Sequence, residues 1–232
     1  MSKAEQWQGA VIAWQQAIEH NTSEVWCYHH LGMALIKLEK WSEARQALNQ
    51  FIELNPDFSW SYFHLGDALA KEQCWPEAIA AYRHFLTKDV STYAYERLGD
   101  CLLKQLRPFA TGAKLLQSEA SHCYYRAIEV DRDYLPPYYK LMELEPYNPA
   151  IASMLAETYA RSEEWFTAVV FYQMALQMNP NLATVHFELA IVLEHLQQLK
   201  PATIHYQQAT NLAPHESKYS SHLKEILERV ED

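Results

Sequence analysis

Pairs of leucine and a small residue recur along this chain at a fixed interval, which constrains the fold more than any other feature. Leu31-Gly32, Leu65-Gly66 and Leu98-Gly99 lie 34 and 33 residues apart, and Leu155-Ala156 and Leu189-Ala190 are again 34 apart. A large residue precedes most pairs by three positions and an apolar residue follows each by four, a spacing that lines one face of a helix. A period of this length predicts a chain built from one repeated supersecondary unit.

A second pattern follows each pair: an alanine, then a leucine or tyrosine four residues later, then an apolar residue three further on. The copies are Ala44-Leu48-Phe51, Ala78-Tyr82-Phe85, Ala120-Tyr124-Ala127, Ala168-Tyr172-Ala175 and Ala202-Tyr206-Ala209, with Ala10-Trp14-Ala17 ahead of the first pair. Small residues let two helices approach closely, and the large residues around them fill the remaining space. One such helical hairpin cannot bury its apolar face alone, so the pattern predicts a stack of hairpins.

These residues resemble the signature of the tetratricopeptide repeat (TPR) family, which has Trp/Tyr, Leu-Gly, Tyr, Ala, Phe/Tyr and Pro at set places in 34 residues, and the resemblance covers nearly the whole chain. It implies an all-α fold, a right-handed superhelical solenoid of antiparallel helix pairs with about 13 helices. We expect essentially no strand.

The repeat is interrupted in ways that predict how the chain is organised. We expect an N-terminal array over residues 1–133, which opens with an orphan second helix, and a C-terminal array over 134–232 that ends in a capping helix at about 215–231. An insertion at 105–118, with Arg107, Pro108, Gly112 and Lys114, is either a surface loop or a docking element. Pro146 and Pro149 follow a lone first helix, so we expect an irregular break near 131–149.

Known catalytic and metal-binding patterns are missing from the sequence. Gly112-Ala113-Lys114 lacks the leading glycine of a phosphate-binding loop, and no HExxH, CxxC or GxSxG motif occurs. His30 and His64 stand at equivalent places one repeat apart, as structural residues do. We therefore predict no enzymatic activity, no cofactor and no metal.

Net charge and cysteine content indicate which classes of partner and which cellular compartment to expect. A formal net charge of -10 disfavours nucleic acid and anionic membranes, which repel an acidic surface. The N-terminus is polar, and no apolar run reaches the roughly 20 residues that span a bilayer. Four cysteines without a CxxC pair are expected to be free thiols. We expect a cytoplasmic protein with protein or peptide partners.

The resemblance implies that the first helix of each hairpin lines a concave groove that holds a partner. An aromatic residue stands at the mouth, a carboxylate in the middle and a lysine at the far end of successive first helices. The candidate binding residues are Trp26, His29, Lys37, Trp60, Phe63, Asp67, Lys71, Tyr93, Asp100 and Lys104. We expect Trp26, Trp60, Phe63 and Tyr93 to form a partly exposed strip, although packing on neighbouring helices would explain the tryptophans equally well. The Lys and Asn residues with which some relatives read acidic C-terminal tails are absent.

Two functions fit these observations. The leading prediction is a protein–protein interaction scaffold that binds a peptide or protein segment in the groove. The alternative is the substrate-recruiting segment of a larger bacterial glycosyl-, sulfo- or methyltransferase, because similar Gln-rich arrays precede such domains.

Overall fold

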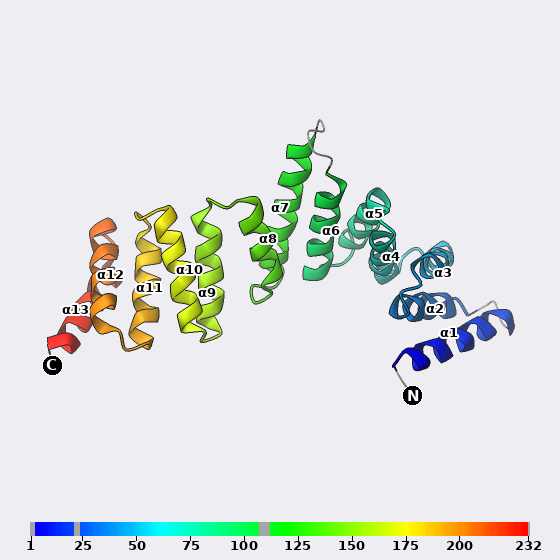
Figure 1. The fold of residues 1–232 in the computed structure, drawn as a ribbon, viewed down its shortest axis with the longest axis horizontal. Helices are drawn as coiled ribbons and strands as arrows, with labels where there is room; N and C mark the ends of the chain where they lie inside the picture. Colours follow the sequence, from blue (N-terminus) through cyan, green and yellow to red (C-terminus); the bar gives the residue numbers. More distant parts are fainter. Residues whose placement is uncertain (1–2, 21–23, 107–111, 232) are drawn as a thin grey trace. The chain divides into compact units, whose positions relative to one another are not determined.

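The computed structural model describes residues 3–20, 24–106 and 112–231. These residues form thirteen α-helices and no strand (Figure 1). The helices are α1 (Lys3–His20), α2 (Trp26–Lys37), α3 (Trp41–Leu54), α4 (Ser59–Lys71), α5 (Trp75–Leu86), α6 (Thr92–Gln105), α7 (Ala113–Val130), α8 (Pro136–Leu144), α9 (Pro149–Arg161), α10 (Trp165–Met178), α11 (Ala183–His195), α12 (Leu199–Leu212) and α13 (Ser217–Glu231). The all-α prediction and its number of helices are confirmed.

The chain divides into two compact units, residues 1–131 and 132–232. Within each unit every helix packs against the next one along the chain, and neighbouring hairpins also meet through α2 with α4 and α9 with α11. We call α2, α4, α6, α9 and α11 the first helices and α3, α5, α7, α10 and α12 the second helices. Each unit is a stack of helical hairpins; that each folds as an independent domain stays a prediction.

The glycine of each Leu-Gly pair lies where a first helix crosses its second helix. A Cβ atom added to Gly66 would lie 2.7 Å from Cε1 of Tyr82, and one added to Gly99 would lie 2.9 Å from Cε1 of Tyr124. At Gly32 the neighbour is Cγ of Leu48, at 2.6 Å. Because no side chain fits at these distances, the recurring glycines are required by packing, as predicted.

Residues with a left-handed backbone close the turn between the two helices of a hairpin. Glu39, Gln73, Glu163 and Gln197 have φ angles of 58°, 62°, 61° and 59°. In each turn the backbone N–H of the residue that follows the left-handed one donates a hydrogen bond to the carbonyl five residues before it. In the second hairpin this bond joins Cys74 to Leu69 at 2.9 Å. This is the hydrogen-bond pattern of a Schellman motif. These turns carry no glycine, which is the residue that would have marked them in the sequence.

We expect Gln73→Gly to leave the free energy of unfolding unchanged or to raise it by up to about 1 kcal/mol, and Gln73→Val to lower it by about 1–2 kcal/mol. Glycine adopts a φ of 62° without strain, whereas a β-branched side chain is disfavoured there. Urea unfolding of the two variants measures the difference. Equal stabilities would show that the turn does not hold this conformation in solution.

Part of the predicted insertion is helical, which corrects the boundary at residue 118. Helix α6 ends at Gln105 as expected, but α7 begins at Ala113, seven residues before Ala120. Gly112, with φ 99°, precedes a run of good helix formers that includes Lys114, and these extend the helix backward. Arg107 and Pro108 lie outside the described residues.

The second unit begins irregularly, with a short helix that starts at Pro136 and another helix that starts at Pro149 after the capping residue Asn148. Helix α8 is a short first-type helix whose Tyr138 is buried and donates a hydrogen bond to the carbonyl of Arg132 at 2.9 Å. No second helix follows, because α9 begins at Pro149 with the side chain of Asn148 accepting from the backbone of Ala150. At the other end, α13 packs against α12.

Candidate functional site

The candidate site is the surface of α2, α4 and α6 in the first unit, which we call the first-helix face. It comprises three aromatic residues near the helix starts, two carboxylates near the middle and four basic residues. These are Trp26, Trp60, Tyr93, Asp67, Asp100, Lys37, Lys71, Arg97 and Lys104.

The aromatic residues are half packed and half exposed. Trp26 lies 5.2 Å from Phe51 between ring centroids, and Trp60 lies 5.1 Å from Phe85, yet they remain 47% and 43% exposed. Tyr93 is 55% exposed. Packing on the following second helix therefore accounts for one side of each tryptophan and leaves the other side to solvent.

Two of the predicted groove residues are buried, and one of them, Phe63, was expected in the partly exposed strip, so that expectation was wrong for Phe63. His29 is 5% exposed and Phe63 is 8% exposed. The ring of His29 is covered by Phe51 and Phe58, and its Nδ1 lies 2.8 Å from the Ser61 hydroxyl. A residue three positions after the aromatic points partly toward the next hairpin, so the stack covers it.

The carboxylates are held by tyrosines of the second helices. The Tyr82 hydroxyl donates to Asp67 at 2.7 Å, and the Tyr124 hydroxyl donates to Asp100 at 2.7 Å. Asp67 also pairs with Arg97, whose Nη1 lies 2.9 Å from its Oδ1. These predicted residues brace the hairpins, and burial raises the pKa of Asp67 despite the nearby cations.

A hollow of about 510 Å³ lies at the basic end of the face. Lys71, Arg97 and Lys104 line it together with Tyr82, Trp75, Gln73, Ala70, Cys101 and Asp100. Lys71 lies over the ring of Trp41, with its Nζ 5.8 Å from the centroid. The structure thus brings Lys71, Asp100 and Lys104 of the prediction into one depression.

Arg97 is a residue of this face that the sequence prediction missed. It occupies the place that His30 and His64 hold in the preceding repeats, and its guanidinium lies 5.7 Å from the centroid of Phe63. The change from histidine to arginine at one repeat position was the signal that could have found it.

Burial and the positive charges of this face lower the pKa of His64, a partly buried residue of α4. Burial, followed by the charges of Lys37 and Arg97, lowers the pKa of His64 to about 4. Burial and the neighbours His64 and His30 lower the pKa of His29 to about 4 as well. Both histidines are thus neutral at pH 7, and the positive potential comes from the lysines and Arg97.

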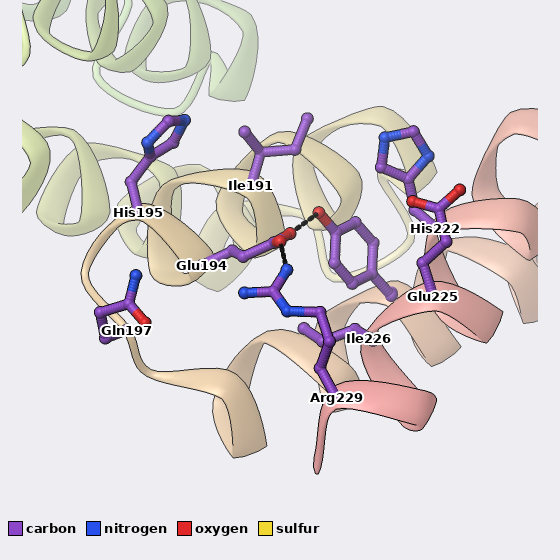
Figure 2. A pocket seen from close by; sticks show the side chains of 9 residues that line it. Ile191, Glu194, His195, Gln197, His222, Glu225, Ile226 and Arg229 are labelled. Carbon is purple, nitrogen blue, oxygen red and sulfur yellow. Dashed lines mark hydrogen bonds and ion pairs between the residues drawn. The ribbon is translucent and has the colours of Figure 1, made fainter. Parts of the chain in front are cut away.

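The first helices of the second unit, α9 and α11, carry the carboxylates Glu157, Glu188 and Glu194. Burial, followed by the charge of Glu188, raises the pKa of Glu157. A hollow of about 370 Å³ lies on this unit. Among the side chains that line it, Glu194 and Arg229 point toward one another and form an ion pair (Figure 2). The Tyr206 hydroxyl donates to the same Glu194 at 2.9 Å, so the charges that line this hollow are largely paired.

The described residues contain no cluster of metal ligands, and the pKa of their buried cysteines is raised. Among them no three His, Cys, Asp or Glu residues gather as they would around a metal ion. The four cysteines are free thiols, and burial raises the pKa of Cys101 and of Cys123 to about 12, which keeps them protonated. No helix of the described chain is both long and apolar enough to cross a membrane.

Comparison with known proteins identifies the repeat. The family model described as "Tetratricopeptide repeat" matches residues 30–89. No curated protein sequence is significantly similar to this chain.

Several solved structures are similar over most of the chain. YrrB, "a TPR protein with an unusual peptide-binding site", is 15% identical, covers 92% of this chain and 98% of its own, and has a TM-score of 0.44. MamA is 18% identical over 84% of this chain and 94% of its own, with a TM-score of 0.44. TTC0263, a thermophilic TPR protein of Thermus thermophilus, is 16% identical over 85% and 95%, with a TM-score of 0.41.

Proposed function

We propose that this chain, which belongs to the tetratricopeptide repeat family, is a protein–protein interaction scaffold that binds an extended protein segment along its first-helix face. The observation that carries this proposal is the row of half-exposed aromatic residues, Trp26, Trp60 and Tyr93. Large rigid side chains of this kind bury much area while few rotatable bonds are frozen, so they are favoured as anchors in interfaces.

The charge of the face indicates what the bound segment carries. Lys37, Lys71 and Lys104 lie at the ends of three successive first helices in a chain whose net charge is -10. Four cations, the three lysines and Arg97, stand on this face against two carboxylates, Asp67 and Asp100, and Asp67 pairs with Arg97. A segment with an apolar or aromatic residue at the tryptophan end and acidic residues at the lysine end is complementary to this face.

A peptide-display selection tests this proposal, with the whole chain as bait and random 12-residue peptides as probes. We expect the selected peptides to combine an aromatic or large aliphatic residue with acidic residues. Calorimetry on one such peptide then compares variants. We expect Trp26→Ala, Trp60→Ala together to weaken binding about thirtyfold or more, because each anchor contributes roughly 1–2 kcal/mol.

The controls separate loss of the site from loss of the fold. Phe166→Ala removes an aromatic side chain that is 73% exposed in the second unit and should leave affinity unchanged. Phe63 is unsuitable, because truncating a buried ring would open a cavity. If the double tryptophan variant stays helical and binds the selected peptides as tightly as the wild type, the site lies elsewhere.

We expect neutralising the three lysines with Lys37→Gln, Lys71→Gln and Lys104→Gln to weaken binding of the same peptide less than the double tryptophan change does. Exposed charges act mainly on the association rate, and salt screens them within a Debye length of about 8 Å at physiological ionic strength. Titrations at low salt and at roughly tenfold higher salt measure the effect, which should shrink as salt rises. An effect that is independent of salt would contradict an electrostatic role.

A further inference from the structure

Two hollows of this chain lie at the same place of the repeat, one in each unit. The hollow of about 510 Å³, which we call hollow 1, is lined by residues of α4, α5 and α6. The hollow of about 370 Å³, which we call hollow 2, is lined by residues of α11, α12 and α13. When the repeats are aligned on Leu65 with Leu189 and on Leu98 with Leu223, all but one of the residues that line hollow 1 have their counterpart in the lining of hollow 2.

Hollow 2 contains an acid of its own. The carboxylate of Glu194 accepts a hydrogen bond from the Tyr206 hydroxyl at 2.9 Å and forms an ion pair with Arg229 (Figure 2). The negative charge of Glu194 therefore compensates the guanidinium at the α13 side of the hollow. Hollow 2 thus shows which chemical group this place of the repeat accommodates, namely a carboxylate held by a cation.

Hollow 1 has the cation but not the acid. Ala70 stands at the position of Glu194, and Lys104 stands at the position of Arg229. Within the described residues the ammonium group of Lys104 forms no ion pair with a carboxylate, whereas its counterpart in hollow 2 does. A small side chain at Ala70 also leaves room in the hollow where hollow 2 is occupied by a glutamate.

The charges at hollow 1 leave one positive charge uncompensated. Lys71, Arg97 and Lys104 line the hollow. Asp67 pairs with Arg97, and Asp100 lines the hollow while accepting a hydrogen bond from a tyrosine of α7. Three cations against these two carboxylates leave an excess of one positive charge. One carboxylate neutralises this excess, whereas a phosphate group, with a charge of about −1.5 to −2 at pH 7, exceeds it.

We infer that hollow 1 is a specificity subsite for one acidic side chain of the bound segment, whose carboxylate takes the place that Glu194 has in hollow 2. The inference rests on the proposed function, and it assigns one acidic residue of the segment to a defined set of partners. The ammonium groups of Lys71 and Lys104 donate to the carboxylate. The Trp41 ring, 5.8 Å from the Nζ of Lys71, helps to hold the first of them in place.

Ala70→Glu tests this directly, because it supplies the acid from inside the chain and removes no residue that binds. We expect it to weaken binding of an acidic, C-terminally amidated peptide from the display selection at least tenfold, since like charges at one place repel strongly. Ala70→Gln adds a side chain of the same size without the charge and should weaken binding by about threefold at most. Gln46→Glu, the control, adds the same charge at an exposed position of α3 and should leave the affinity unchanged.

A matched set of peptides shows whether the charge acts at this place. We expect one acidic residue of the peptide whose change to glutamine weakens binding to the wild type at least tenfold but binding to Ala70→Glu by no more than about twofold. Such non-additivity marks a direct interaction. Phosphoserine in place of that residue should bind no tighter than glutamate. Equal losses on the two proteins, or a phosphoserine peptide that binds tenfold tighter than the glutamate peptide, would overturn the inference.

Thermal unfolding without peptide examines hollow 1 by itself. At low salt Ala70→Glu should melt about 1–3 °C above Ala70→Gln, because only the carboxylate gains the attraction of the lysines. The difference should vanish when Lys71→Gln and Lys104→Gln are added. If no peptide is selected, the proposed function fails, and this difference alone still decides whether the hollow accepts a carboxylate. If the selected peptides bind through the tryptophans but Ala70→Glu melts no higher than Ala70→Gln, the inference fails by itself.

Discussion

Gly66→Leu should lower the free energy of unfolding by about 3 kcal/mol, the upper end of what overpacking a core costs. The first atom of the new side chain already lies 2.7 Å from Cε1 and 2.9 Å from Cδ1 and Cζ of Tyr82. Tyr82 is fully buried, and its hydroxyl is bonded to Asp67, so the ring cannot turn aside without losing that bond. The helices must move apart instead.

Thermal unfolding followed by circular dichroism measures this effect, expected as a fall in the melting temperature of roughly 6–12 °C. Gly9→Ala is the matched control, since nothing lies within 4 Å of the Cβ atom that it adds to α1. That variant should be more stable by about 0.5–1 kcal/mol, because glycine inside a helix costs conformational entropy. A Gly66→Leu variant that melts like the wild type would show that this glycine does not lie at a crossing.

The crossing residues could be predicted because the sequence repeats them. Leu31-Gly32, Leu65-Gly66 and Leu98-Gly99 fix the register, and a small residue against a large one has one packing solution. The turn residues could not be predicted, because Glu39 and Gln73 adopt a left-handed backbone that the tertiary packing imposes against their preference.

The candidate site was predicted in outline only. The exposed tryptophans and lysines follow from their helical spacing, but the burial of His29 depends on Ser61, which the next hairpin brings to it. The spacing of residues within α2 alone cannot indicate a contact with Ser61, which belongs to another hairpin. Likewise, Asp67 was expected as a surface charge, whereas Tyr82 and Arg97 make it part of the packing.

Acid should destabilise this protein well above the pH at which most carboxylates titrate. An unfolded histidine has a pKa near 6.5, whereas His29 and His64 have a pKa of about 4 in the folded chain. Between these values the unfolded chain binds more protons than the folded chain, so the free energy of unfolding falls as the pH falls. For His205 in the second unit, burial and the neighbouring His186 also lower the pKa, which acts in the same direction.

The expected loss of stability is large because both histidines contribute to it over the same pH range. Each contributes at most about 1.4 kcal/mol per pH unit, so lowering the pH from about 6.5 to about 4.5 should cost about 3–5 kcal/mol in all. Burial raises the pKa of Asp67, which has the opposite sign and offsets part of this loss at the acidic end. The charges of the nearby Lys37 and Arg97 oppose protonation of His64 in the folded chain.

Urea unfolding at half-unit steps from about pH 7 to about pH 4.5 measures this dependence, and His29→Gln isolates one histidine. Glutamine can keep a hydrogen bond to Ser61 but cannot take up a proton, so the variant should lose less stability on acidification, by up to about 1.4 kcal/mol per unit. His215→Gln is the control, because that side chain is 78% exposed and its removal leaves the core intact. Parallel curves for the wild type and His29→Gln would show that the pKa of His29 is the same in the folded and unfolded chain, which would contradict its burial as a neutral ring.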